Sequence, residues 1–194
     1  AREGTLLDVA SERDFIAILM DNLRNGETII DGDTQLEFHP TTELIRIPEN
    51  EITHVQQVET EQSNSTALVD NAYVVKIYRK LEQGINPELE VGRFLTEVAG
   101  FGNSPALLGS IELIESGKRS AVGIVHAFVQ NQGDAWTVTS AYLDRFVEQE
   151  RILSASDQSE IREDLVSYQR YMAQVGRRLA ELHSAFAGNQ ELPD

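Results

Sequence analysis

Cysteine is absent from this 194-residue chain, and positive charge is scarce. Without cysteine, the chain forms no disulfide and offers neither a thiol nucleophile nor a cysteine-based zinc site. Its 16 lysine and arginine residues are outnumbered by 32 aspartate and glutamate residues, which gives a formal net charge of −16 at pH 7. Nucleic acids and anionic membranes are bound by positively charged surfaces, so we expect neither as a partner.

Long apolar runs and a secretion signal are also missing. No segment approaches the roughly 20 apolar residues that a membrane-spanning helix needs. The first residues show no basic flank followed by an apolar signal core. We therefore expect a soluble, cytoplasmic protein. No two of the four histidines stand at metal-ligand spacing, so no dedicated metal site is predicted.

The most informative stretch runs from residue 58 to residue 98. It contains a polar turn whose backbone N–H groups and hydroxyls can cradle a phosphate. The residues of this turn are Gln62, Ser63, Asn64, Ser65 and Thr66. Lys76 follows within an apolar run, and Asn86-Pro87 marks the start of a helix that has Glu88 and Glu90 in its first turn. A phosphate loop, a strand lysine and a helix glutamate occur in this order in kinase N-terminal lobes.

Each of these residues also has a simpler structural explanation. Lys76 can be a solvated lysine on the outer face of a strand, although its alternating neighbours Val74 and Tyr78 are rather apolar for open solvent. Any carboxylate is favoured at a helix N-terminus, so this argument supports Glu88 and Glu90 equally. The polar turn lacks the glycines of a Gly-rich kinase loop. From the residues alone, both readings stay open.

Three segments of the chain resemble the maltokinase family. They are EQSNST at 61–66, VVKIYRKLEQGINPELEVGRFLTE at 74–97 and NQGDAW at 131–136. The resemblance covers roughly residues 6 to 187 and is closest to the N-terminal half of the maltokinase part that is fused to trehalose synthase in many bacteria. These enzymes have the aminoglycoside-phosphotransferase type of kinase fold and make maltose 1-phosphate from maltose and ATP. The resemblance therefore implies an ATP-dependent sugar kinase of trehalose, glycogen and α-glucan metabolism.

The resemblance also assigns roles to residues. Lys76 would orient the ATP phosphates, Glu90 would hold Lys76, and the polar turn at 62–66 would cover the phosphates. Glu90 is preferred to Glu88 only because it aligns with the helix glutamate of the family. Backbone groups between Val125 and Val129 would hold the adenine, through Val125, Ala127 and Val129. His126 is explained most simply as a hydrogen-bonded residue of a buried strand.

The family's catalytic aspartate and Mg²⁺ ligands lie downstream, in segments that this sequence does not contain. We therefore expect a fragment that has no catalytic residue or metal ligand of its own, binds ATP weakly and does not phosphorylate maltose by itself. The alternative is a non-catalytic kinase-like module that regulates or scaffolds a fused trehalose synthase. Catalytic acids in the complete gene product would favour the enzyme, and their absence would favour the scaffold.

An α+β fold follows from these assignments. We expect a partial cap subdomain at 1–52, a kinase-like N-terminal lobe at 53–130 and the first helices of a truncated C-terminal lobe at 131–194. The lobe should contain about five antiparallel strands and one helix. That helix should run from Pro87 to Val98 and bury Val91, Phe94, Leu95 and Val98.

Other elements are predicted from local signals. A capping box at Ser11–Asp14 should start the first helix, and strands are expected at 28–30, 35–39 and 43–47. Two long helices are expected near 135–151 and 158–187. The second has an apolar seam from Ile161 to Phe186, which should fold back on the first helix or pair with another copy in a homodimer.

Overall fold

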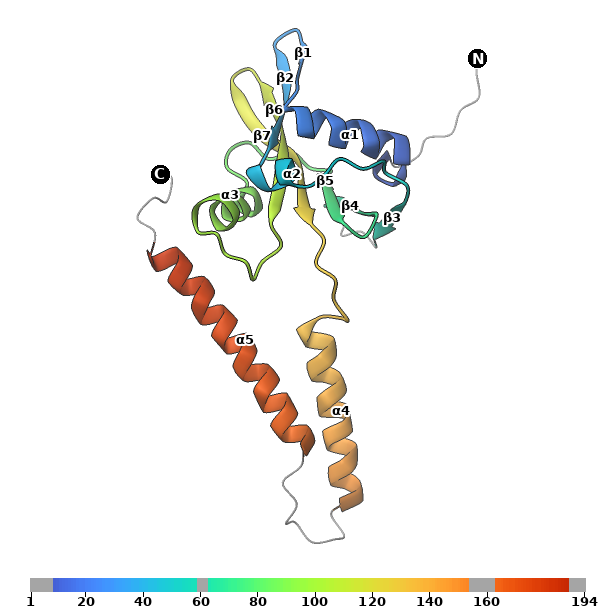
Figure 1. Cartoon of the computed structure of the whole chain (residues 1–194), viewed down its shortest axis with the longest axis vertical. Helices are drawn as coiled ribbons and strands as arrows, with labels where there is room; N and C mark the ends of the chain where they lie inside the picture. Colours follow the sequence, from blue (N-terminus) through green and yellow to red (C-terminus); the bar gives the residue numbers. More distant parts are fainter. Residues whose placement is uncertain (1–8, 59–62, 154–162, 189–194) are drawn as a thin grey trace. The chain divides into compact units, whose positions relative to one another are not determined.

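The computed structural model describes residues 9–58, 63–153 and 163–188 (Figure 1). The chain divides into two compact units, with the boundary between Val129 and Gln130. The first unit is built on one sheet with helices, and the second contains two helices. The predicted α+β class is confirmed.

A seven-stranded antiparallel sheet organises the first unit, with the strand order β1-β2-β6-β7-β5-β4-β3. The strands are β1 Thr28–Asp31, β2 Thr34–Pro40, β3 Val55–Val58, β4 Asn64–Val69, β5 Tyr73–Tyr78, β6 Leu107–Glu115 and β7 Lys118–Ala127. The sheet has more strands than the five predicted for the lobe, because β2 pairs with β6 along its whole length and brings β1 with it. Strands from both sides of residue 52 share this sheet, and a separate cap subdomain stays a prediction.

One face of the sheet is covered by α1, Arg13–Asn25 (Figure 1). Its buried side chains are Ile16, Leu19, Met20 and Leu23. They pack against strand residues of the main core, which include Phe38, Val69, Val75, Leu108, Ile111 and Val125. A glycine is needed where α1 approaches the sheet, since a Cβ on Gly109 would lie 2.7 Å from Cδ1 of Leu23 and 2.8 Å from the carbonyl oxygen of His39.

The other face carries α3, Pro87–Arg93, which continues as the π-helical turn η2, Phe94–Val98 (Figure 1). Its start is as predicted, since the Asn86 side chain accepts a hydrogen bond from the Leu89 N–H at 3.1 Å and Pro87 follows. A smaller core joins the helix to the sheet through Leu89, Leu107, Ala121 and Ile124. Because successive strand residues point to opposite faces, Ile124 and Val125 belong to different cores.

Burial along α3 and η2 differs from the prediction at two positions. Phe94 and Leu95 are buried as expected, but Val91 is 41% exposed and Val98 is 46% exposed. Leu89 takes the place expected of Val91. Val91 lies two residues after Leu89 and therefore points about 200° away from it around the helix axis, away from the smaller core.

The predicted strand at 43–47 is wrong, because the structure has a short helix there, α2, Thr42–Arg46. The ladder of β2 ends at Pro40, and the Thr41 hydroxyl donates to the carbonyl oxygens of Leu107 at 2.8 Å and Leu108 at 3.0 Å. The backbone then turns as a helix and buries Leu44 completely. A half-buried strand would bury every second residue, whereas only Leu44 is buried in α2.

The predicted capping box is also wrong. The 3-10 turn η1, Val9–Ser11, precedes α1, and the N-cap residue is Glu12, which makes no side-chain capping hydrogen bond. At its C-terminal end, α1 is capped by Gly26 in the left-handed conformation at φ +62°. Such a glycine cap satisfies the last carbonyl groups of a helix.

The second unit contains α4, Ala135–Leu153, and α5, Glu163–Gly188. Asp134 caps α4 by accepting a hydrogen bond from the Thr137 N–H. The rings of Tyr142 and Tyr168 stack at 4.0 Å, and the Tyr168 hydroxyl donates to Thr139 at 3.4 Å. The predicted return of α5 onto α4 is thus present, while the homodimer alternative stays a prediction. Ile161, the first residue of the predicted seam, lies outside the described residues.

No helix in the described part of the chain is both long and apolar enough to cross a membrane.

Candidate functional site

Lys76 stands on β5 and faces α3. Its Nζ lies 2.7 Å from Oε2 of Glu88, and the Tyr78 hydroxyl donates to the same oxygen at 2.9 Å. Nζ is also 5.6 Å from the centre of the Tyr78 ring, within the range of a cation–π interaction. The Lys76 side chain is 22% exposed, so the ammonium group is partly shielded but reachable from solvent.

The side chains of β5 alternate between the two cores. Val75 is buried in the α1 core, whereas Lys76 and Tyr78 face α3. Asn86 and Pro87 fix the first turn of α3, which places Glu88 opposite Lys76. The prediction that Lys76 faces the helix carrying Glu88 and Glu90 is confirmed.

The glutamate in contact with Lys76 is Glu88, not Glu90. Residues two apart in an α-helix point about 200° apart around the axis, so only one of the two can face the lysine. Glu90 instead lines a cavity of about 420 Å³ beside α3, together with Leu89 and Arg93. The sequence could not decide between the glutamates, because the helix dipole favours both.

The predicted phosphate turn is largely a strand. Gln62 lies outside the described residues, Ser63 is in a turn, and the three residues that follow begin β4. Thr66 is the ladder partner of Lys76, so these two side chains share a face. Asn64 is paired with Tyr78 on that same face.

Ser65, between them, points to the opposite face. It is buried there, and its Oγ accepts a hydrogen bond from Nε of Arg79 at 3.0 Å. The structure therefore brings the side chains of Asn64 and Thr66 to the Lys76 face and separates Ser65 from them. Strand alternation is the physical cause.

The segment predicted to hold the adenine lies at the end of β7. Val125 is fully buried in the α1 core and pairs with Val75 and Gly109. The Ala127 N–H donates to the Ala106 carbonyl and the Phe128 N–H to the Ala72 carbonyl, at 2.9 and 2.8 Å. Val129, which is 54% exposed, lies at the last position of the first unit. Contacts to adenine from the backbone of Val125, Ala127 and Val129 stay a prediction.

His126 lies on the Lys76 face of β7, as the ladder partner of Val74. Its Nδ1 is buried and has no partner by hydrogen-bond geometry among the described residues, although the backbone of Ala106 and Pro105 lies close enough to raise the pKa of the ring. Burial lowers the pKa of His126 and outweighs the opposing effect of the nearby Glu88 carboxylate. The imidazole is therefore neutral at pH 7 and fills the space below Gly92 of α3, where an added Cβ would lie 3.4 Å from its Cε1.

A second charged cluster, which sequence reasoning missed, attaches the other end of α3 to the sheet. Its centre is Glu112 of β6, whose side chain is only 6% exposed. Arg119 donates to its Oε2 at 2.8 Å and Ser110 to its Oε1 at 3.0 Å. Arg93 of α3 approaches Oε1 at 3.7 Å and donates to Ser110 at 3.2 Å. The available signal was a glutamate at an inward-facing position of a strongly apolar strand.

The partners of Glu112 keep it ionised. Burial raises the pKa of this carboxyl group, but the hydrogen bonds from Arg119 and Ser110 outweigh burial and hold the pKa below its ordinary value of 4.5. The carboxylate can therefore bind the guanidinium groups of both β7 and α3 at neutral pH.

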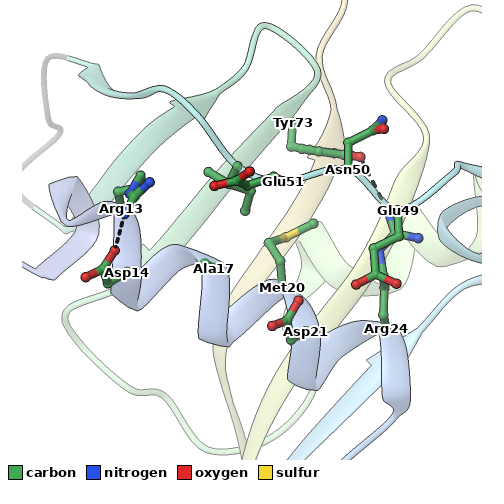
Figure 2. Close-up of a pocket in the computed structure, with 11 residues that line it drawn as sticks. Arg13, Asp14, Ala17, Met20, Asp21, Arg24, Glu49, Asn50, Glu51 and Tyr73 are labelled. Carbon is green, nitrogen blue, oxygen red and sulfur yellow. Dashed lines mark hydrogen bonds and ion pairs between the residues drawn. The ribbon is translucent and has the colours of Figure 1, made fainter.

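A further cavity of about 520 Å³ lies on the α1 side of the sheet (Figure 2). Arg24 lines it and donates to the Ile47 carbonyl at 2.8 Å and to the Tyr73 hydroxyl at 3.4 Å. Its carboxylates are Asp14, Asp21, Glu49 and Glu51. In the described parts of the chain, no group of three His, Cys, Asp or Glu side chains is placed to hold a metal ion. None of the predicted site residues lines this cavity.

No protein-family model matches the sequence. Among solved structures, a glucosamine kinase in complex with glucosamine, ADP and inorganic phosphate is similar at a TM-score of 0.58 and 18% identity, over 92% of this chain and 37% of that one. Its crystal form A gives 0.57 and 18%, over 88% and 34%. Its crystal form B gives 0.56 and 19%, over 90% and 36%. The fold of this chain is that of part of a sugar kinase.

The sugar-kinase fold agrees with the kinase part of the sequence-based resemblance. The maltokinase family and the link to trehalose synthase are finer statements, which a likeness of 18–19% identity does not test. The chain spans 34–37% of the length of the glucosamine kinases that it matches.

We expect Glu112→Gln to lower the free energy of unfolding of the first unit by about 2 kcal/mol at pH 7, since it leaves Arg119 without its buried partner. The pKa of Glu112 is lowered by folding, so its contribution is present above the ordinary value of 4.5 and is lost as the pH falls through the lower folded value. The stability difference between wild type and variant should therefore shrink below pH 4.5.

The only tryptophan, Trp136, lies in the second unit, so its fluorescence would not report on the first unit. Urea unfolding is therefore followed by circular dichroism. Glu43→Gln is the control, as the ion pair of Glu43 with Arg46 is at the surface. A difference that persists unchanged to pH 3 would contradict the ionised role of Glu112.

Proposed function

We propose that the first unit, with the Lys76 face of its sheet, is the nucleotide-binding part of an ATP-dependent sugar kinase. The observation that carries this proposal is the contact of a strand lysine with a helix glutamate, Lys76 with Glu88, at 2.7 Å. It is supported by the sugar-kinase fold and by the ADP in one of the similar glucosamine kinase structures.

Lys76 is suited to contact phosphate oxygens. Its ammonium group is partly exposed, and its ladder neighbour Thr66 adds a hydroxyl on the same face. With a net charge of −16, the chain as a whole repels ATP, so a local cation is required. Glu88 would hold the ammonium group in one direction. In this role Glu88 helps to position the phosphates and takes no part in the reaction itself.

The resembled family has its Mg²⁺ ligands and its base in segments downstream of this sequence. We propose that a Mg²⁺ ion and a catalytic base are supplied there and not by the described residues. The activity of a complete kinase is proposed only for a longer protein that contains this chain.

Maltose is the proposed sugar, on the basis of the three segments that resemble maltokinase. A trehalose synthase, fused or associated, is the proposed partner on the same basis. Glucosamine is a second candidate, because it is the sugar in the first of the similar kinase structures.

We expect Lys76→Met to weaken binding of Mg·ADP by at least about tenfold, as a charged contact to phosphate is lost. Affinity of the wild-type chain should itself be weak, about millimolar. Titration followed by NMR suits this range. Lys80→Met is the matched control, since Lys80 follows β5 and pairs only with Glu82 at the surface. Equal effects of both substitutions would show that Lys76 acts through net charge alone.

The two glutamates of α3 can be separated by the same titration. Glu88→Gln should weaken Mg·ADP binding severalfold because Lys76 loses its charged partner, whereas Glu90→Gln should leave it unchanged. The reverse result would favour the family alignment, in which Glu90 holds the lysine, and would require α3 to rotate when nucleotide binds.

Release of ADP by a longer protein that contains this chain tests the sugar. We expect maltose to support release, glucosamine to support less, and Lys76→Met to abolish most of it. A preference for glucosamine would replace maltose as the substrate. If neither maltose nor glucosamine supports ADP release, the non-catalytic regulatory or scaffold module is favoured.

A further inference from the structure

We propose that Tyr78 is a positioning residue, which holds Glu88 through its hydroxyl and thereby fixes the direction of the Lys76 ammonium group. This inference rests on the proposed nucleotide-binding function. Nothing in the resemblance or in the sugar-kinase fold assigns a role to Tyr78.

Tyr78 contacts both members of the ion pair. Its hydroxyl donates to Oε2 of Glu88 at 2.9 Å, the oxygen that Lys76 also contacts at 2.7 Å. Its ring centre lies 5.6 Å from the Lys76 ammonium nitrogen. The three side chains therefore form a closed triangle, in which each contacts the other two. Moving any one of them breaks two contacts.

The ion pair needs this third member. The Glu88 side chain is 42% exposed, and partly exposed ion pairs contribute little energy to hold two flexible side chains in one geometry. Tyr78 is more rigid, because it is partly buried on β5 and packs against the smaller core. A rigid donor on a strand restricts the rotamers of Glu88 in a way that the mobile ammonium group does not.

The tyrosine also keeps Glu88 in place when the lysine is engaged elsewhere. If Lys76 turns toward a phosphate, Glu88 still accepts the hydrogen bond from Tyr78. The hydroxyl stays a donor at physiological pH, because burial and the bond to Glu88 both raise the pKa of Tyr78. Glu88 thus offers a fixed acceptor to which the ammonium group returns.

The test compares Tyr78→Phe with Tyr73→Phe. Both residues lie on β5, and each substitution removes one hydroxyl, but Tyr73 lies on the α1 side, where its hydroxyl accepts from Arg24. The first readout is the NMR signal of the Lys76 side-chain nitrogen, measured without nucleotide. The second is the affinity for Mg·ADP. Tyr78→Met serves as a second variant at the same position.

We expect Tyr78→Phe to move the Lys76 signal toward that of a solvated lysine and to weaken Mg·ADP binding about fivefold, a modest effect for a hydrogen bond to a charged group that is partly exposed. Tyr73→Phe should change neither. An unchanged Lys76 signal in both Tyr78 variants would overturn the positioning role. A Lys76 signal that moves while Lys76→Met leaves Mg·ADP binding intact would support the positioning role and refute the nucleotide function.

Discussion

The alternation of side chains along β5 is the constraint on which the first unit depends. β5 is paired on both sides, with β4 and with β7, so its register is fixed by two ladders. Val75 is buried in the α1 core, while Lys76 and Tyr78 face α3. A slip of one residue would bury the ammonium group and expose the core. The main core and the candidate site are therefore specified together.

Polar contacts position α3 more than apolar packing does. Leu89 is its main apolar contact with the sheet, in a core of only four buried residues. Glu88 attaches the first turn to β5, and Arg93 attaches the last turn to Ser110 and Glu112 of β6. Such polar contacts fix the orientation of α3 on the sheet but add little to the free energy of unfolding. α3 is thus placed accurately on the sheet although little apolar surface is buried beneath it.

Local signals in the sequence predicted the elements well where backbone chemistry is decisive. Asn86-Pro87 starts α3, where the Asn86 side chain caps the helix and Pro87 has the backbone conformation of a first helical residue. Prediction failed where tertiary contacts decide. The hydrogen bonds of Thr41 to β6 make a helix of a segment that resembled a strand, and strand pairing turns Ser65 away from Thr66.

The choice between Glu88 and Glu90 failed for a related reason. Propensity and the helix dipole act on the first turn as a whole and do not sense rotation about the helix axis. That rotation is fixed by the distant pair of Arg93 with Ser110 and by burial of Leu89. No pattern within the segment 74–97 contains this information, because Ser110 and Glu112 lie on another strand.

The charge balance of the site sets the role of Lys76. Glu88 already neutralises the ammonium group, so a phosphate must compete for it in a strongly acidic chain. A phosphate can compete with Glu88 for the Lys76 ammonium group because partly exposed ion pairs are weak, about 1 kcal/mol or less. Lys76 therefore contributes a charged contact to phosphate, and Glu88 contributes the direction of that contact.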